Sequence, residues 1–470
     1  MITIISNCKR LCFKFIFYLS VIFVYFTFKQ ASAQWVIETS LNNPQAIFNY
    51  LSSADSTNVW VIGSTWSNNT PIIYRRFDGI IWLEVSLSGI SNQPLTCIAA
   101  LSSSTAFVGA GNNNASMYKT TNNGNNWQIA FNTGGNSGYL NDVRFSRKHP
   151  AYGYACSDPP AGNGTPFKIY KTSNYGQNWT VFDAAIINNY VGYTPSICVT
   201  DSNHAWFGLN KNVGGSNYGK ILCTTNGGLN FSTLSLPMVG YVTSSIEFKD
   251  NNLVGMAAMQ EHSNYYFKTT NGGLNWNYYS SPYYFGNCKR IISIPNSNVW
   301  YVAIEILGPS GRILKSTDDG TTWVSMSTPG NQYQIEYMDA VLKGNKVYAF
   351  AVSLEGHILK LIDTVALTPV SNEGELIPDK YILYQNYPNP FNPTTKIRFD
   401  IPSNVKRQTS NVKLVIHNVI GKEITTLINE QMNPGTYEVE WDASNYPSGI
   451  YYYKLTSGDY SETKKMIFIK

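Results

Sequence analysis

Three carboxylates in the middle of the chain are the best candidates for catalytic groups. Asp142 lies in the run "LNDVRF", and Glu336 and Asp339 lie in "QIEYMDAVL". A glycosidase places two carboxylates about 5–10 Å apart on either side of the scissile bond, and these residues offer such a pair if both runs face one cavity. Hydrogen bonding along a blade edge explains Asp142 and Asp339 equally well, so we assign no catalytic residue.

Patterns for nucleophilic, metal or redox chemistry are missing from the sequence. The five histidines do not pair at the intervals of zinc ligands, and no Ser/His/Asp or Cys/His arrangement is apparent. Five cysteines follow residue 33 without a CxxC pair, and Cys97, Cys198 and Cys288 fall in apolar runs, where small buried side chains are common. We therefore expect neither a metal site nor a cofactor.

The first 33 residues have the pattern of a secretory signal peptide. Lys9, Arg10 and Lys14 precede an apolar run over residues 15–28, and an Ala-Ser-Ala cleavage site covers residues 31–33. The run is shorter than the roughly 20 apolar residues of a membrane-spanning helix, and no later segment predicts such a helix. Without these residues the chain loses four of its 34 basic and none of its 29 acidic residues. The remaining charges nearly balance, so nothing indicates binding to nucleic acid.

One ten-residue stretch occurs five times in the middle of the chain. The copies are "YKTTNNGNNW", "YKTSNYGQNW", "LCTTNGGLNF", "FKTTNGGLNW" and "LKSTDDGTTW", and they end at Trp127, Trp179, Phe231, Trp276 and Trp323. They recur every 45–52 residues, and a second pattern of the type "TAFVGAG" occurs seven times. Repeats of about 45 residues that hold several short strands are typical of β-propeller blades.

Each repeat divides into four strands, with "LTCIAAL", "TAFVGAG", "ASMYKTT" and "NWQIAFN" as the example. The repeated stretch is the turn between the third and fourth strands, and its closing aromatic residue is expected to pack between blades. A glycine in this turn allows the positive φ of a tight hairpin: Gly124, Gly176, Gly228, Gly273 and Gly320. We therefore predict an all-β, seven-bladed propeller over residues 34–365. Residues 35–40 would supply the last strand of blade seven and close the ring.

The turn resembles the Asp-box, or BNR, motif S/T-x-D-x-G-x-T-W. The last copy matches it fully, with Ser316, Asp318, Gly320, Thr322 and Trp323, and the other four copies have asparagine for the aspartate: Asn122, Asn174, Asn226 and Asn271. The region is thus similar to the propellers of sialidases, xyloglucanase-type glycosidases, sortilin and photosystem II assembly factor-like proteins. The resemblance implies a fold rather than a function, and a ligand face opposite the boxes. A calcium site at "DDG" is the alternative to a plain hairpin turn.

The loops on the expected ligand face favour binding over catalysis. A tyrosine precedes the first strand of five blades: Tyr139, Tyr193, Tyr241, Tyr284 and Tyr333. Tyrosine offers a flat apolar face with a hydroxyl, and the neighbouring loops are rich in asparagine, so sugars or extended peptides suit this surface. Plain packing at strand ends is the alternative. Sialidase chemistry would need three converging arginines, and the FRIP signature is missing although the region holds six: Arg75, Arg76, Arg144, Arg147, Arg290 and Arg312.

A linker over residues 366–379 is expected between the propeller and a second β domain. Three prolines between Pro388 and Pro393 disfavour a helix there. Later runs such as "TYEVEW", "VKLVIHN" and "GIYYYKL" have the character of strands. They predict a small Ig-like β-sandwich over residues 380–470.

This second domain closely resembles the type A C-terminal sorting domain of the type IX secretion system. The matching residues include Pro388, Asn389, Pro390, Phe391, Gly435, Trp441, Gly449, Tyr451 and Lys465. The resemblance implies passage through the periplasm and the outer membrane of a Gram-negative-type bacterium. It also implies the secretion machinery and a sortase-like peptidase as partners, and a final place on the outer cell surface or in the medium. A generic adhesive sandwich is the alternative.

Together these features predict a secreted propeller that binds polysaccharide or protein through its funnel without catalysis. A carbohydrate-active hydrolase that uses funnel carboxylates is one alternative, and a protein scaffold of the assembly-factor type is another. Two acidic residues facing each other across the funnel would favour the hydrolase. A tyrosine-lined funnel would favour binding, and a large apolar patch on the rim would favour the scaffold.

Overall fold

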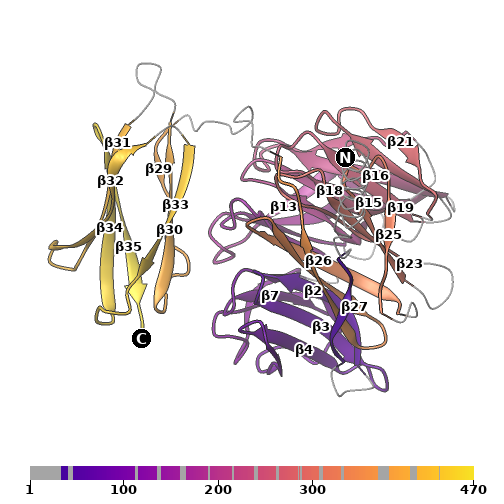
Figure 1. Ribbon diagram of the computed structural model, residues 1–470, viewed down its shortest axis with the longest axis horizontal. Helices are drawn as coiled ribbons and strands as arrows, with labels where there is room; N and C mark the ends of the chain where they lie inside the picture. The colour runs from indigo at the N-terminus through magenta and orange to yellow at the C-terminus, as the bar shows by residue number, and fades with distance from the viewer. Residues whose placement is uncertain are drawn as a thin grey trace, which may run out of the picture. The chain divides into compact units, whose positions relative to one another are not determined.

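The structure is a computed structural model that describes most of the chain. The described residues are 33–40, 46–111, 115–134, 139–158, 166–188, 191–213, 216–237, 242–260, 264–283, 285, 288–305, 311–329, 333–368, 380–402, 410–432 and 435–470. The predicted signal peptide and linker lie almost entirely outside these ranges. No described residue is helical, and the chain divides into two compact β units, residues 1–368 and 369–470 (Figure 1).

The first unit contains seven four-stranded antiparallel sheets, which are the blades. Blade one is β2 (Ala46–Ser53), β3 (Val59–Thr65), β4 (Pro71–Phe77) and β5 (Ile81–Glu84), and blade two is β6 (Leu95–Ala100), β7 (Ala106–Ala110), β8 (Ser116–Thr120) and β9 (Gln128–Asn132). Blade three is β10 (Leu140–Phe145), β11 (Gly153–Ser157), β12 (Pro166–Thr172) and β13 (Thr180–Asn188), and blade four is β14 (Val191–Val199), β15 (Ala205–Val213), β16 (Ser216–Thr224) and β17 (Ser232–Leu234).

The remaining three blades repeat this arrangement. Blade five is β18 (Val242–Phe248), β19 (Gly255–Gln260), β20 (Tyr265–Thr269) and β21 (Asn277–Ser280), and blade six is β22 (Cys288–Ser293), β23 (Trp300–Glu305), β24 (Gly311–Ser316) and β25 (Val324–Met326). Blade seven is β26 (Ile335–Lys343), β27 (Lys346–Ser353), β28 (His357–Thr364) and β1 (Val36–Ser40).

The blades form a closed ring. The first strands of successive blades contact one another from β2 through β6, β10, β14, β18 and β22 to β26 and back to β2, and Figure 1 shows β26 and β27 beside β2. Blade seven takes its fourth strand from the other end of the unit, because β1 pairs antiparallel with β28 and places Val36 opposite Lys360. The predicted seven-bladed propeller is therefore confirmed.

Hydrogen bonds inside each repeated turn explain its sequence. In the copy that matches the Asp-box fully, the Gly320 N–H donates to Ser316 Oγ, and the Thr322 N–H donates to Asp318 Oδ1, both at 2.8 Å. Gly320 has a φ of +77°, a conformation that favours glycine. In the four asparagine copies the side-chain oxygen accepts the equivalent N–H at 3.0–3.3 Å. A neutral amide therefore makes the same turn as the carboxylate.

The aromatic residue that closes the repeat packs against the preceding blade. Trp127 lies edge-on to Trp60 of blade one at 6.0 Å between ring centroids, and Trp323 lies edge-on to Tyr266 of blade five at 5.8 Å. All four of these aromatic side chains are buried. Edge-to-face contacts between buried rings stabilise the blade interfaces beyond the area that they bury.

The second unit is a two-sheet β-sandwich. One sheet contains β29 (Ile382–Leu383), β30 (Thr394–Ile401) and β33 (Gly435–Asp442), and the other contains β32 (Glu423–Met432), β31 (Ser410–His417), β34 (Gly449–Ser457) and β35 (Tyr460–Phe468). In β34 every second residue from Tyr451 to Ser457 is buried, which is the period of a strand with one face on a core. That core includes Ile397, Leu414 and Trp441, so both sheets contribute to it.

Candidate functional site

Loops of different kinds lie on the two faces of the propeller. On one face, the loop that leads into a blade meets the loop between the second and third strands, as when the Asp158 N–H donates to the Tyr139 carbonyl at 3.0 Å. On the opposite face, the repeated turn meets the loop between the first and second strands, as when the Asp319 N–H donates to the Asn298 carbonyl at 2.9 Å. The predicted funnel tyrosines precede the first strands of their blades. We therefore call the face with the Tyr139–Asp158 hydrogen bond the ligand face.

The structure describes the side chains of two of the five predicted tyrosines. Tyr139 is exposed, with 42% of its surface accessible, whereas Tyr333 is half-buried and its ring lies 4.2 Å from that of His357 between centroids. Tyr193 lies in β14, but its side chain is outside the described part of the structure, and Tyr241 and Tyr284 lie outside the described residues altogether. The ring of five tyrosines therefore stays a prediction.

An exposed tryptophan that sequence reasoning missed lies on the same face. Trp66 is 71% exposed and follows β3 in the loop between the second and third strands of blade one. The loop is fixed by a hydrogen bond from the Asn69 N–H to the Thr65 carbonyl (3.0 Å) and by Asn68 Oδ1, which accepts from Thr70 Oγ1 at 2.8 Å. A tryptophan in the polar loop "STWSNNT" was the signal available in the sequence.

A charged cluster joins blades six and seven where the first and second strands reach the ligand face. Lys289 Nζ lies 3.0 Å from Glu305 and 3.1 Å from Glu336. Gln334 Nε2 donates to the same two carboxylates at 3.0 and 3.1 Å. Burial alone would lower the pKa of Lys289, but the two glutamates raise it. Of these residues the sequence singled out only Glu336.

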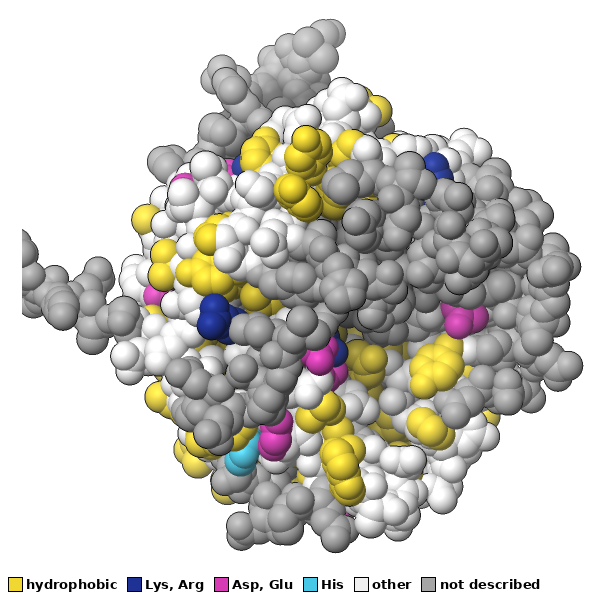
Figure 2. All heavy atoms as spheres, turned by 90° about the vertical axis from the view of Figure 1, so that its right-hand side faces the viewer, with side chains coloured by type: hydrophobic (Ala, Val, Ile, Leu, Met, Phe, Trp, Pro, Cys, Tyr) yellow, Lys and Arg dark blue, Asp and Glu magenta, His cyan; other side chains and the backbone are white. Residues whose placement is uncertain are grey.

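The distance between the Glu305 and Glu336 carboxylates bears on whether the cluster could be catalytic. Two carboxylates that share one ammonium have their nearest oxygens at most about 6 Å apart, which is within the range of a glycosidase pair. The ammonium of Lys289, however, occupies the space between Glu305 and Glu336. On the face of the molecule in Figure 2, acidic and basic side chains gather near the middle, beside a hollow that hydrophobic side chains line in part.

The other two carboxylates singled out in the sequence are buried and hold neighbouring blades together. Asp142 Oδ2 accepts the N–H of Ile197 in the next blade at 3.0 Å, and Asp339 Oδ2 accepts the N–H of Ser53 in blade one at 2.9 Å. The first strand of each blade is an edge strand whose N–H groups on that side need partners from outside the sheet. Serine hydroxyls do the same elsewhere, with Ser52 accepting from Ala100 and Ser245 from Ile291. Asp142 and Asp339 therefore accept hydrogen bonds at strand edges, which was the alternative to a catalytic role.

Three of the six arginines meet where the first strands of blades three, five and six converge. Glu247 binds Arg290 at 3.2 Å and Arg147 at 3.3 Å, and Arg147 Nη1 also donates to the Ser293 carbonyl across the ring. The Arg144 guanidinium lies 5.5 Å from the ring centre of Tyr337 in blade seven. Burial, together with the nearby Arg144, lowers the pKa of Arg290. These arginines bind carboxylates and backbone of the protein itself, unlike the substrate-binding arginines of a sialidase.

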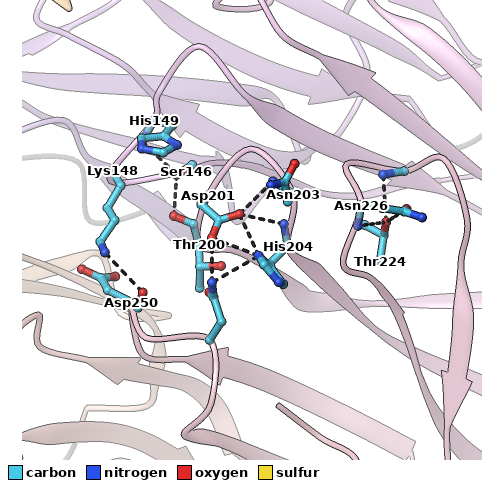
Figure 3. Close-up of polar contacts among 12 residues, drawn as sticks. Ser146, Lys148, His149, Thr200, Asp201, Asn203, His204, Thr224, Asn226 and Asp250 are labelled. Atoms are coloured by element: carbon cyan, nitrogen blue, oxygen red, sulfur yellow. Dashed lines mark hydrogen bonds and ion pairs between the residues drawn. The ribbon is translucent and has the colours of Figure 1, made fainter. Parts of the chain in front are cut away.

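A polar cluster on the opposite face links blades three, four and five (Figure 3). Asp201 accepts the N–H groups of Asn203 and His204 at 2.7 and 2.9 Å, and Nδ2 of Asn252 in blade five at 2.6 Å. The Ser146 hydroxyl of blade three donates to the Thr200 carbonyl at 2.7 Å. Burial alone would raise the pKa of Asp201, but hydrogen bonding to the His204 side chain and to these donors lowers it. The cluster is a structural joint between loops.

Asp201 makes the stability of the propeller depend on pH. Its pKa in the folded protein lies below the ordinary value of 3.8, so the carboxylate contributes stability above that value and loses it as the pH falls further. Asp201→Ala should therefore lower the free energy of unfolding at pH 7 by about 1–3 kcal/mol, and the difference from the parent should shrink below pH 4. Denaturant unfolding at pH 7, 5 and 3 measures it, with Glu84→Ala, at an exposed glutamate of the propeller, as the control. A difference that does not change with pH would contradict the assignment.

The described part of the chain contains no group of side chains suited to metal binding or thiol chemistry. No group of three or more histidine, cysteine, aspartate or glutamate side chains there is arranged to hold a metal ion. The five described cysteines are free and buried, and burial raises the pKa of Cys97 and of Cys288 to about 12. Thiols of this kind stay protonated at neutral pH and act as small apolar side chains.

Most of the predicted sorting residues meet at one end of the sandwich. Phe391 is 2% exposed, and its ring lies 5.5 Å from that of Trp441 and 5.1 Å from that of Phe468. Asn389 Oδ1 accepts the N–H of Ile467 at 2.9 Å. The ring of Tyr451 lies 5.2 Å from that of Trp441. The proline loop is thus attached to the last strand through an aromatic core.

Comparison with known families identifies this unit. Residues 385–470 match the family described as the secretion system C-terminal sorting domain. The C-terminal unit is a type IX sorting domain. The protein is therefore exported by the type IX secretion system to the cell surface or beyond, as the sequence predicted. Within the described ranges no helix is long and apolar enough to cross a membrane.

Solved structures share the propeller fold. "YCF48 bound to D1 peptide" aligns with a TM-score of 0.50 and 14% identity, covering 72% of this chain and 96% of that one. An ancestral GH74 enzyme aligns with a TM-score of 0.51 and 14% identity, covering 91% of this chain but only 60% of the enzyme. At these identities the likeness shows the fold alone. No curated protein matches the sequence.

Proposed function

We propose that the propeller is a non-catalytic binding module that type IX export places on or outside the outer cell surface. Its ligand is a polysaccharide or a protein, and it binds on the ligand face. The observation that carries the proposal is the pair of exposed aromatic side chains there, Trp66 at 71% and Tyr139 at 42%. Tryptophan is highly buried on average, and tryptophan and tyrosine are enriched at binding interfaces.

Hydrogen bonds at the backbone support the same proposal. They hold Tyr139 at its own carbonyl and Trp66 at the carbonyl of the preceding Thr65, so little conformational entropy is lost when a ligand covers these side chains. The Trp66 loop also carries asparagine and threonine side chains, and Asp158 accepts from Asn141 Nδ2 at 2.9 Å beside Tyr139. YCF48, which shares the fold, is described as bound to a peptide. A flat ring next to amide and carboxylate groups suits a sugar or an extended peptide equally.

Hydrolysis of a polysaccharide is the second candidate, because Glu305 and Glu336 both lie within hydrogen-bonding distance of Lys289. This activity would require Lys289 to move from between the carboxylates when substrate binds. A hydrolase would release shorter products from a bound polysaccharide, and Glu336→Gln would stop the release while leaving binding in place. Product analysis on any polysaccharide that binds decides between the two candidates.

The test of binding uses the mature chain, from residue 34, on a broad panel of polysaccharides and glycans. Trp66→Ala and Tyr139→Ala should each weaken binding about 10- to 100-fold, the range of an aromatic anchor. Tyr278→Ala is the matched control, because this tyrosine is 59% exposed but lies on β21, the fourth strand of its blade. Equal losses for all three variants would contradict the assignment to the ligand face.

A separate set of variants tests the predicted tyrosine ring. Tyr193→Ala, Tyr241→Ala and Tyr284→Ala should weaken binding of the same ligand if the funnel is the site. If the protein binds none of the glycans, a protein ligand is favoured. The next experiment is then a pull-down from outer membrane and culture medium. The scaffold alternative would then be favoured.

A further inference from the structure

The sorting domain carries two adjacent apolar side chains that its own core does not use. In the turn between β31 and β32, Val419 is 64% exposed and Ile420 is 81% exposed. Turns are usually polar because they meet water, and single exposed apolar residues are common. A comparable pair occurs in the propeller at Ile80 and Ile81, at 79% and 55%, but both residues of the sorting-domain pair lie in the turn itself and project from the fold together.

The turn holds this pair in one position. Asn418 Oδ1 accepts the N–H of Ile420 at 3.1 Å and the N–H of Lys422 at 2.9 Å. The Asn418 N–H also donates to the Lys422 carbonyl at 3.0 Å, and Gly421 adopts a φ of +78°. A side chain presented by such a turn loses little conformational entropy on binding.

The tip lies at the same end of the sandwich as the sorting residues. His417 pairs with Tyr452, and Tyr452 pairs with Lys465, so the tip extends beside the first residues of β34 and the last residues of β35. Two more exposed apolar residues belong to this end, Ile450 at 41% and Ile469 at 52%. This is the end of the sandwich that Figure 1 marks with the C-terminus. The proline loop is bonded to it through Asn389 and Phe391.

Lysines lie around these apolar residues, together with two exposed acids, Asp442 and Glu423, of which Glu423 pairs with Lys413 at 3.5 Å. Lys422, Lys465 and Lys470 are exposed at this end, and none of the three has an ion-pair partner within the described ranges. Two other lysines of the sandwich do have ion-pair partners, since Lys396 pairs with Glu438 at 2.8 Å and Lys464 pairs with Glu462 at 3.0 Å. The end therefore combines an apolar centre with three lysines that make no ion pair within the described ranges.

We propose that this end docks into an apolar pocket with an acidic rim on a protein of the type IX secretion machinery. Val419 and Ile420 are the side chains that enter the pocket, and Lys422, Lys465 and Lys470 meet the rim. The match of residues 385–470 to a sorting domain means that a protein must recognise this unit. The tip offers that protein a fixed apolar anchor, and charge complementarity at the rim speeds association and selects the partner. The proposal rests on the sorting domain and is independent of what the propeller binds.

The test measures export of the full chain from a bacterium that has a type IX secretion system. Val419→Ser with Ile420→Ser should lower the exported fraction at least tenfold and leave folded protein in the periplasm, as quantified by immunoblots of periplasm, cell surface and medium. The matched control is Leu229→Ser with Leu274→Ser, two leucines that are 82% and 78% exposed in propeller turns. The control should be exported like the parent. Export of the tip variant at the parental level overturns the proposal.

Two further measurements separate docking from other causes. If the tip variant melts at a lower temperature than the parent, the double variant Lys422→Glu with Lys465→Glu tests the proposal instead, because both side chains are exposed. Reduced export of this variant supports docking. Unchanged export overturns the proposal. Light scattering tests whether the tip joins two copies of the chain. A parent dimer that becomes a monomer in the tip variant would also overturn the proposal.

Discussion

Replacing Glu247 with alanine is expected to lower the free energy of unfolding of the propeller by about 3–5 kcal/mol, the loss typical of breaking a buried ion pair. Glu247 binds Arg290 and Arg147 at 3.2 and 3.3 Å, and it accepts from Ser293 Oγ at 3.2 Å. Without this carboxylate Arg290, only 2% exposed, would keep its charge with no acid in contact. The bonds from this carboxylate to blades three and six would be lost at once.

Denaturant unfolding followed by tryptophan fluorescence measures this loss. Glu84→Ala is the control, because Glu84 is an exposed glutamate at the end of β5 with one long hydrogen bond, from the Tyr74 hydroxyl at 3.3 Å. It should change the free energy of unfolding by no more than about 0.5 kcal/mol. A Glu247→Ala loss below about 1 kcal/mol would show that the arginines find other partners and that the network does not hold the blades together.

Phe391→Ala is expected to destabilise the sorting domain by about 3–5 kcal/mol and to abolish export. The substitution leaves a cavity among Trp441, Tyr451 and Phe468, and large cavities in a core carry losses of this size. It also weakens the attachment of the proline loop, in which the Phe391 N–H donates to the Ile467 carbonyl at 3.0 Å. A small β domain has little stability to lose, so the sorting signal would unfold.

The measurement for Phe391 has two parts. Thermal unfolding of the full chain should show an early transition for the sorting unit while the propeller transition stays in place. Immunoblots should find the protein in the periplasm and not outside the cell. Phe391→Leu is the control, since it keeps most of the volume and should cost about 1–1.5 kcal/mol, with export largely retained. Normal export of Phe391→Ala would show that the machinery does not require the folded end of the sandwich.

The fold follows from the sequence because its signals are local and repeated. A hairpin turn needs glycine and an Asn or Asp at fixed offsets, and five copies at similar intervals predict blades without any knowledge of long-range contacts. The strand pattern of the second unit predicts only a β-sandwich, and its role in sorting was predicted from the resemblance of its motif residues to a known family. Both expectations are confirmed by the sheets and by the family match.

The ligand face follows from the sequence only in part. The order of strands predicts which loops share a face, because antiparallel strands alternate in direction. It does not predict exposure: Trp66 and Tyr139 are exposed, but Tyr333 packs against His357. Burial of a loop side chain depends on the loops of neighbouring blades, about 45 residues away, and no local pattern records them.

Local patterns predict the blades and turns of this protein, and a family resemblance predicts its sorting unit, whereas the role of each charged residue depends on contacts between blades. In a regular strand successive side chains alternate between faces, so a pattern of two predicts which residues point inward. Each first strand contains a register shift, as between Leu140 and Asp142 or between Cys288 and Arg290. A β-bulge inserts one residue and reverses the alternation beyond it. Its position and the partner blade are fixed only when the ring closes, which is why Asp142 joins two blades and Glu336 shares Lys289 with Glu305.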